Sequence, residues 1–446
     1  HPIGWNVAMM TKWKLALQRV TRRMWFRATL YCLLGIATAL AGAFLKFLIP
    51  EGLAARIGAD SVGNILAILA ASMLTVTTFA LSTMVSAYSS ASNSATPRAA
   101  RLLIEDSRTQ GALATFIGAF LFSIVGLIAL STGLYGDSGR LVLFGATIAV
   151  IAVITVTLLR AIEQLSRFGR LGETIELVEH ATLRAMQQRA RDPLLGCRAC
   201  ADTLPEDLAR LVAEDVGHVE HIDTARLQDL AEAHDLQIHV LCQPGTFATA
   251  ARPLLGVEGQ ADETVRADLL ECFTLGDGRR IENDPRFGLV VLSEIALRSL
   301  SRAVNDPGTC IEVLGRGVRL LTGWSHALQG APEPDVRFAR VHLAALRVED
   351  FFEDFFAPIA RDSGSTVEIH IKLQKGYAAL GRAPSAALRR TALAYARQAL
   401  ARAMAQVSFE ADREAIRTVA AQENGVGVES TCAGPGPASV RPASPA

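Results

Sequence analysis

The sequence lacks an excess of charge of either sign: its 446 residues include 44 lysines and arginines and 44 aspartates and glutamates. A chain without net charge has no overall field to attract a polyanion, so we expect no nucleic-acid partner. Its 7 cysteines are odd in number and scattered, which argues against a disulfide framework. The pair Cys197 and Cys200 has no second pair to complete a zinc site, so we predict no metal.

Catalytic motifs are also missing from the sequence. It contains no nucleophile elbow, P-loop, HExxH sequence or dinucleotide-binding fingerprint. Enzymatic catalysis requires a nucleophile with its base, or a bound metal or cofactor. We therefore expect that the protein is not an enzyme and that it holds no cofactor.

Four long segments lack charged residues altogether, in a chain whose mean hydropathy is +0.28. A membrane-spanning helix needs about 20 mostly apolar residues, and buried helices of soluble proteins rarely run as long without a charge. We therefore predict an α-helical membrane domain with four transmembrane helices. Their apolar parts cover residues 28–45, 65–84, 111–130 and 141–159.

Basic residues flank these segments on alternate sides. They precede the first segment, recur between the second and third as Arg98, Arg101 and Arg108, and follow the fourth. Lysines and arginines near spans favour the cytoplasmic side. We predict a multi-pass protein of the bacterial inner (plasma) membrane, with its N- and C-termini in the cytoplasm.

The second apolar segment differs from the others by a polar stripe. Its members recur every three or four residues and so share one helical face. If several copies of the helix surrounded an axis, this face would line a pore without fixed charge. Alternatively, the small hydroxyl residues allow close packing between helices. The stripe consists of Thr75, Thr78, Ser82, Ser86, Ser89 and Asn93.

The remainder predicts a cytoplasmic α+β domain. Short strands near 219–222, 236–242 and 254–257, with Pro-Gly turns, favour a small β barrel or sandwich. Helices are expected later, at 338–359 and 386–413 among others. We expect six parts: a basic segment (1–27), the transmembrane domain (28–165), a stalk helix and connector (166–215), a β-rich subdomain (216–275), a helical subdomain (276–422) and a disordered tail (423–446).

A dense group of charged residues lies in the helical part. Two Asp-Pro pairs there predict helix starts, because aspartate caps the first turn and proline fits its first position. The group forms either a capped, salt-bridged helical hairpin or a site for an anion or phosphate near the helix N-termini. Its members are Arg279, Arg280, Asp284, Glu294, Arg298, Asn305 and Asp306.

The same region carries a family resemblance. The run from Asp284-Pro-Arg-Phe-Gly-Leu to Asn305-Asp-Pro, together with Pro244-Gly-Thr-Phe and the second apolar segment, resembles the uncharacterised bacterial membrane family called domain of unknown function 2254. The resemblance covers most of the chain and implies the membrane topology, but no activity. The sequence departs from the family pattern at Asn283, Glu294, Arg302 and Thr246.

Two functions follow from these features. The polar stripe and the missing catalytic motifs favour an oligomeric channel or transport pathway, with the cytoplasmic part as vestibule or gate. The charged group favours instead a membrane-anchored sensor or scaffold that binds an anionic ligand or a protein. The expected partners are the lipid bilayer, further copies of the chain, and an ion or small anionic ligand.

Overall fold

The computed structural model describes the chain as two compact units, His1–Leu177 and Val178–Ala446. Each unit is built around its own hydrophobic clusters. The described residues are 29–30, 32–33, 36–38, 59–104, 107–132, 137–167, 170–201, 204–205, 208–331 and 335–425.

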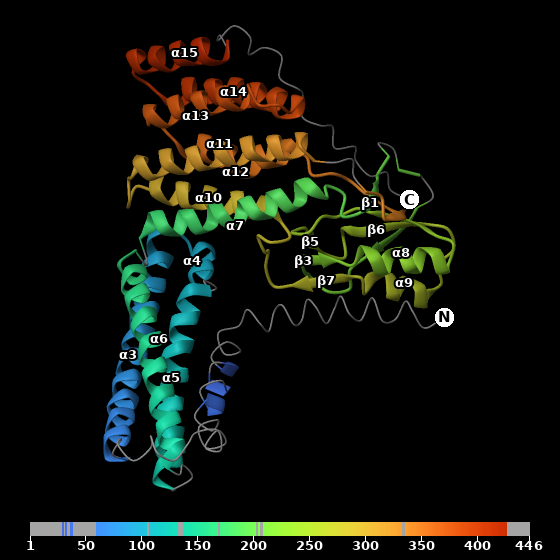
Figure 1. Cartoon of the computed structure of the whole chain (residues 1–446). Helices are drawn as coiled ribbons and strands as arrows, with labels where there is room; N and C mark the ends of the chain where they lie inside the picture. The colour runs from blue at the N-terminus through green and yellow to red at the C-terminus, as the bar shows by residue number, and fades with distance from the viewer. Residues whose placement is uncertain are drawn as a thin grey trace. The chain divides into compact units, whose positions relative to one another are not determined.

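Three helices of the first unit are long and apolar enough to cross a membrane: α3 (Ala59–Ser94), α5 (Ser107–Ser131) and α6 (Asp137–Arg167). They lie side by side and contain the second, third and fourth predicted spans (Figure 1). Most of the first predicted span lies outside the described residues. The structure therefore supports three membrane helices, and the first predicted span stays a prediction.

The side chains between these helices explain why they pack. Leu66 and Met73 of α3 are buried against apolar side chains of α5 and α6, including Phe116 and Phe122. At 36 residues α3 is about 54 Å long, which exceeds the roughly 30 Å hydrocarbon core of a bilayer. The helix therefore continues beyond the apolar layer, as its polar C-terminal residues require.

A short helix follows α3 after a break. Helix α4 (Pro97–Ile104) begins at Pro97, and the Thr96 hydroxyl accepts a 3.1 Å hydrogen bond from the amide of Ala99. Proline cannot donate a backbone hydrogen bond but fits the first helical turn. Pro97 therefore separates α3 from α4.

The second unit contains two β-sheets. The five-stranded sheet has the order β1-β8-β4-β6-β2 and the three-stranded sheet the order β5-β3-β7. Both contribute side chains to one core, but no hydrogen bonds between described residues close them into the predicted barrel. The strands are β1 (Cys197–Ala199), β2 (Ala209–Val212), β3 (Gly217–Ile222), β4 (Gln237–Val240), β5 (Phe247–Ala248), β6 (Pro253–Glu258), β7 (Phe273–Gly276) and β8 (Phe338–Leu343).

Two strand–helix–strand segments interlock within these sheets. One is β3, α8 (Thr224–Ala233) and β4, and the other is β6, α9 (Glu263–Leu270) and β7. The first strand of each segment pairs antiparallel with the last strand of the other. Both helices begin after an aspartate, Asp223 or Asp262, whose side chain accepts a backbone hydrogen bond from the first turn.

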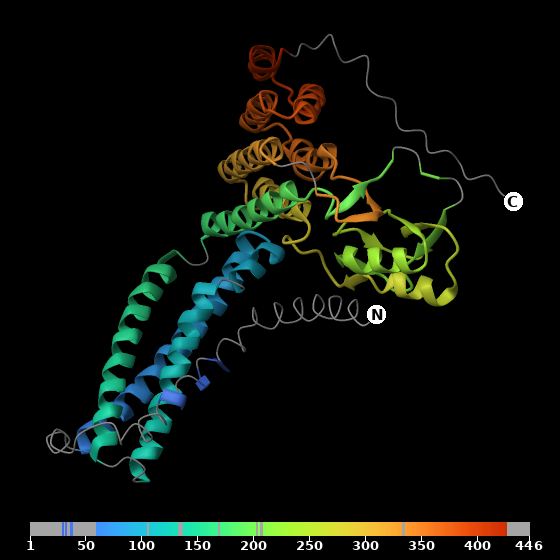
Figure 2. The same cartoon turned by 45° about the vertical axis from the view of Figure 1, so that its right-hand side comes forward.

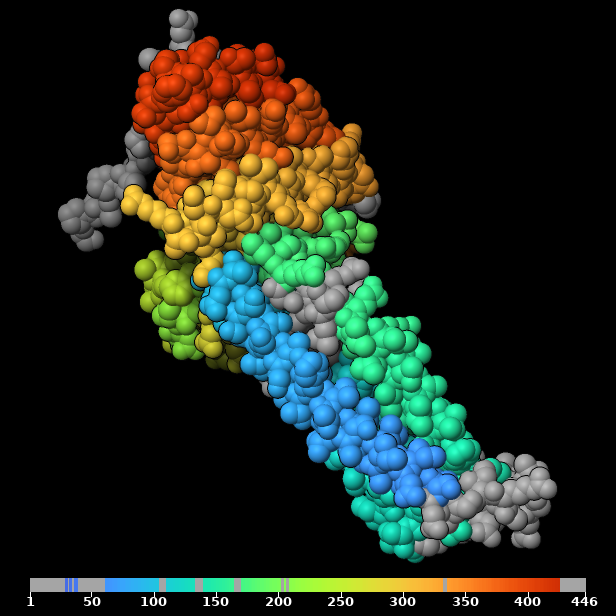
Figure 3. Space-filling view, turned by 90° about the vertical axis from the view of Figure 1, so that its left-hand side faces the viewer, coloured from blue at the N-terminus to red at the C-terminus, as the bar shows by residue number. Residues whose placement is uncertain are grey.

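Helices form stacked layers in the rest of the unit (Figures 1 and 2). The space-filling view shows these layers as bands from yellow to red (Figure 3). Four phenylalanines of α12 are fully buried: Phe351, Phe352, Phe355 and Phe356. The helices are α7 (Leu171–Arg191, which begins in the first unit), α10 (Pro285–Leu300), α11 (Pro307–Gln329), α12 (Val348–Asp362), α13 (Val367–Leu380), α14 (Ala386–Gln406) and α15 (Glu410–Asn424).

Two helix predictions need correction. The helix expected at 338–359 is instead strand β8 followed by α12, because residues 338–343 pair with β1 and β4 as their common neighbour. Burial alternates toward the end of this strand, as suits a sheet. The helix expected at 386–413 breaks between Gln406 and Glu410, where Val407 and Phe409 are extended.

Candidate functional site

The polar stripe of α3 lies on the outer face of its own helix bundle. All six of its predicted members are exposed, whereas Leu66, Met73 and Ala91 are buried on the other side. With 3.6 residues per turn, Thr75 and Ser82 lie about 160–180° around the helix axis from Leu66. The stripe therefore does not hold α3 to α5 or α6.

The stripe carries hydroxyl groups but no charge. The hydroxyls of Thr75 and Thr78 donate to the carbonyls of Ala71 and Leu74, at 3.0 and 2.9 Å. Such back-bonding satisfies the donor inside the helix while the oxygen can still accept. This face can therefore form hydrogen bonds with water and bind ions weakly. It can also pack closely against another helix.

Sequence reasoning missed one member of this face. Asn64 is exposed and lies three helical turns before Thr75, so it extends the stripe toward the start of α3. The spacing of 11 residues could have revealed it.

The charged group centres on a buried carboxylate at the start of α10. Asp284 is 3% exposed and caps the helix by accepting a 3.3 Å hydrogen bond from the amide of Phe287. The Nε of Arg279 donates to its other oxygen at 2.7 Å. Burial raises the pKa of Asp284, and the Arg279 hydrogen bond opposes that rise. The carboxylate thus serves as both cap and ion-pair partner.

A turn from the β region covers this carboxylate. Gly245 has φ +92° and lies so close that a Cβ there would be 1.9 Å from Oδ2 of Asp284. Its neighbour Gln243 donates to the carbonyl of Ala344 and accepts from the buried guanidinium of Arg189. Burial lowers the pKa of Arg189 to about 10, which remains far above neutral pH.

The remaining members of the group do not join this cluster. Arg280 pairs with Glu220 at 3.2 Å. Arg298 is exposed in the last turn of α10, about 21 Å along the helix from Asp284. Asp306 caps α11, where it accepts 3.1 and 2.6 Å hydrogen bonds from the amide and hydroxyl of Thr309.

Asn305 and Glu294 have separate surroundings. Asn305 is exposed and adopts φ +51°, a left-handed conformation that asparagine tolerates better than most residues. Glu294 is half-buried in the middle of α10. The structure therefore brings Arg279 and Asp284 together but does not bring Arg298, Asn305 or Asp306 to them.

Two further ionic networks escaped the sequence analysis. Arg286 binds both Asp350 and Asp354 of α12, at 2.8 and 2.7 Å. Glu179 of α7 is 7% exposed and accepts hydrogen bonds from Arg316 and Arg319 of α11, at 2.6 Å from the Arg319 Nε. These partners lie more than 60 residues apart in sequence, so no local spacing signals them.

The Glu179 network predicts a pH effect. Burial raises the pKa of Glu179, but the hydrogen bonds from Arg319 and Arg316 outweigh it, so the pKa lies below its ordinary value of 4.5. A lowered carboxyl pKa stabilises the fold above pH 4.5, and this stabilisation is lost as the pH falls through the folded-state pKa. Glu179→Gln should lower the unfolding free energy at pH 7 by about 2 kcal/mol.

Thermal unfolding of the detergent-solubilised protein at pH 7 and pH 4 measures this effect. The Glu179→Gln variant should lose less stability between the two pH values than the wild type. The matched control Glu214→Gln changes an exposed glutamate and should behave as the wild type. Equal pH dependence of wild type and Glu179→Gln would contradict the assignment.

Comparison with known proteins places the chain in a family. The model of a family described as predicted membrane protein, DUF2254, matches residues 21–379. The chain belongs to this family. The match confirms the family resemblance seen in the motifs, and the three apolar helices agree with a place in the membrane.

The similar curated proteins of this DUF2254 chain are uncharacterised. Proteins of Mycobacterium bovis and Mycobacterium tuberculosis are 26% identical to it over 263 residues, or 56% of this chain and 50% of each relative. The chain thus spans about half the length of the curated relatives it matches. No solved structure matches it.

The fold explains why two distant DUF2254 segments go together. The turn around Gly245 and the helix start at Asp284 carry part of the family resemblance, and they touch in space. Gly245 leaves room for the Asp284 carboxylate, which in turn caps α10. In this contact the shared residues have a structural role, because every charged group that we identify there binds another group of the same unit.

Proposed function

We propose that the protein is a homo-oligomeric channel or transport pathway of the bacterial inner membrane. Copies of α3 line the path with the polar stripe, and the second unit forms a cytoplasmic vestibule or gate. The observation that supports this proposal is the exposure of all six stripe residues on the side of α3 that faces away from α5 and α6. If this face were turned to lipid, its polar groups would find no hydrogen-bond partners there. Around a central axis they would contact water.

The topology of the proposal comes from the basic flanks. The chain crosses the membrane several times, and both termini lie in the cytoplasm. Because the stripe has no fixed charge, we expect weak selectivity between anions and cations. Ser82, Ser86 and Ser89 let neighbouring copies of α3 approach closely along that part of the helix.

Flux through reconstituted liposomes tests the channel. Vesicles with the purified protein should release trapped potassium or chloride faster than empty vesicles, under an applied potential or an osmotic downshift. Flux equal to that of empty vesicles under all these conditions would overturn the proposal.

A substitution within the stripe should abolish most of that flux. Ser82→Leu combined with Ser86→Leu replaces hydroxyls by bulky apolar groups, and hydrophobic constrictions block conduction by dewetting. We expect at least a tenfold loss, measured as initial efflux rate per incorporated protein. The matched control Thr155→Leu changes an exposed threonine of α6 and should leave flux unchanged. Equal loss in both variants would show that the stripe is not the path.

The charged group does not form a specific binding site that would support the sensor or scaffold alternative. Arg279 and Arg280 each bind a carboxylate of the same unit, and Asp306 binds Thr309. An anion at Asp284 would have to displace an internal ion pair. The symmetry of the oligomer in detergent distinguishes the two functions. A ring with α3 at its axis supports the channel, and a dimer with paired α3 helices supports the scaffold.

A further inference from the structure

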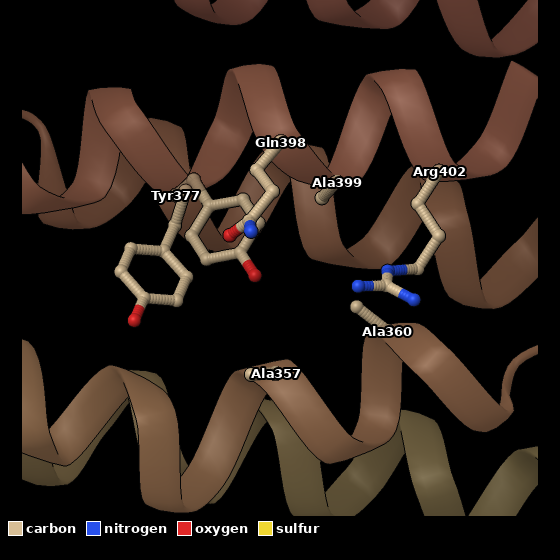
Figure 4. Close-up of a pocket in the computed structure, with 7 residues that line it drawn as sticks. Ala357, Ala360, Tyr377, Gln398, Ala399 and Arg402 are labelled. Atoms are coloured by element: carbon tan, nitrogen blue, oxygen red, sulfur yellow. The ribbon is translucent and has the colours of Figure 1, made fainter. Parts of the chain in front are cut away.

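A small cleft opens between α12, α13 and α14 in the second unit. Figure 4 shows Gln398 and Arg402 on one helix, opposite Ala357 and Ala360 of another. The alanines leave space beside the polar side chains. The cleft has room for a single small guest, such as a water molecule or a monatomic ion.

Tyr377 lines this cleft with a hydroxyl group that has no hydrogen-bond partner among the described residues. Its side chain is 1% exposed, so bulk water does not reach the group freely. Burying a hydroxyl without a partner costs free energy that a bound guest would recover. The unpartnered hydroxyl of Tyr377 therefore indicates that the cleft holds a bound guest.

Arg402 brings positive charge to the same place. None of the residues that line the cleft is acidic. Within the described part of the chain, the ion pairs of this region join other arginines, such as Arg361 and Arg382, to their carboxylates, and none includes Arg402. The guanidinium thus has a charge without a matching carboxylate.

The polar groups of the cleft are all able to donate. Burial raises the pKa of Tyr395 to about 12, and carboxylates nearby, with Glu353 first, add to the rise. Burial also raises the pKa of Tyr377. Both phenols therefore stay protonated at neutral pH and can donate hydrogen bonds, as can Gln398 and Arg402.

We propose that this cleft binds a small inorganic anion of halide size, held by the Arg402 guanidinium and the Tyr377 hydroxyl. The guanidinium supplies charge and N–H donors, and the phenol supplies a buried O–H donor with no other partner. A water molecule would bond to the hydroxyl but would leave the charge of Arg402 unmatched. The site is separate from the stripe of α3 and does not depend on the channel proposal.

Thermal unfolding of the full chain in detergent tests this site. Sodium chloride or bromide should raise the midpoint relative to sodium gluconate of equal ionic strength, by about 3–5 °C at ten times Kd. The variants Arg402→Gln and Tyr377→Phe should lose this halide effect. The control Arg397→Gln removes an exposed arginine of the same helix that does not line the cleft, and should keep it.

Line broadening of chloride in ³⁵Cl NMR measures binding directly. We expect broadening with the wild type and Arg397→Gln, and at least a fivefold smaller effect with Arg402→Gln. Midpoints that are equal in all salts, without broadening, would mean that water alone occupies the cleft and would overturn the proposal. A Tyr377→Phe variant that is more stable than the wild type in every salt would also overturn it, because the hydroxyl would then have no ligand.

Discussion

Gly245→Ala should destabilise the second unit by about 4 kcal/mol, through two separate causes. The residue has φ +92°, a left-handed backbone that costs an L-residue roughly 1–2 kcal/mol. The new Cβ would also lie 1.9 Å from Oδ2 of Asp284, and overpacking of this kind costs about 1–3 kcal/mol. Thermal unfolding in detergent should show a fall of roughly 10 °C in the midpoint.

Gly364→Ala separates these two causes. Gly364 has φ +56°, but nothing lies within 4 Å of its ideal Cβ position, so alanine there meets the backbone cost alone. We expect a loss of about 1 kcal/mol for this control. If both variants lost the same stability, the contact between Gly245 and Asp284 would not matter, and the covered helix cap would need another explanation.

Gly317→Ala should destabilise the core of the stacked helices by about 3 kcal/mol. Gly317 of α11 lies against Phe355 of α12, and a Cβ at Gly317 would be 2.1 Å from the ring of Phe355. Phe355 is fully buried and packs edge-on against the ring of Phe356, so it cannot move away without repacking its neighbours. The measurement is again the unfolding midpoint in detergent.

A second glycine of the same helix provides the control. At Gly315 the nearest atom to an added Cβ is Nζ of Lys372, at 3.9 Å. Gly315→Ala should therefore stabilise the protein by about 0.5–1 kcal/mol, because alanine favours a helix more than glycine does. Combining Gly317→Ala with Phe355→Leu should cost less than the sum of the two changes. Additive losses would contradict the close contact.

Local sequence rules predicted the elements that depend on nearby residues. Charge-free runs predicted α3, α5 and α6, because a helix in lipid must satisfy its own backbone groups. The two Asp-Pro pairs predicted the starts of α10 and α11, since capping involves residues three positions apart. The strands around β3, β4 and β6 followed from apolar runs between turn residues.

Contacts between distant segments were not predictable in the same way. The pairing of β8 with β1 and β4 depends on where three separate segments meet. Likewise, no spacing within the sequence shows that Gly245 covers Asp284 or that Arg298 lies at the far end of α10. The stripe of α3 was visible from spacing alone, but only the packing of α5 and α6 shows which way it faces.

The position of β8 also affects how the protein can be made on the ribosome. This strand lies between β1 and β4 in the sheet, yet it begins at Phe338, about 100 residues after β4 ends at Val240. At 5–20 residues per second, synthesis of that stretch takes about 5–20 s. For that time the edges of β1 and β4 that later pair with β8 are unpaired in the nascent chain. The β region therefore depends on chaperones, or on delayed collapse, until β8 has been synthesised.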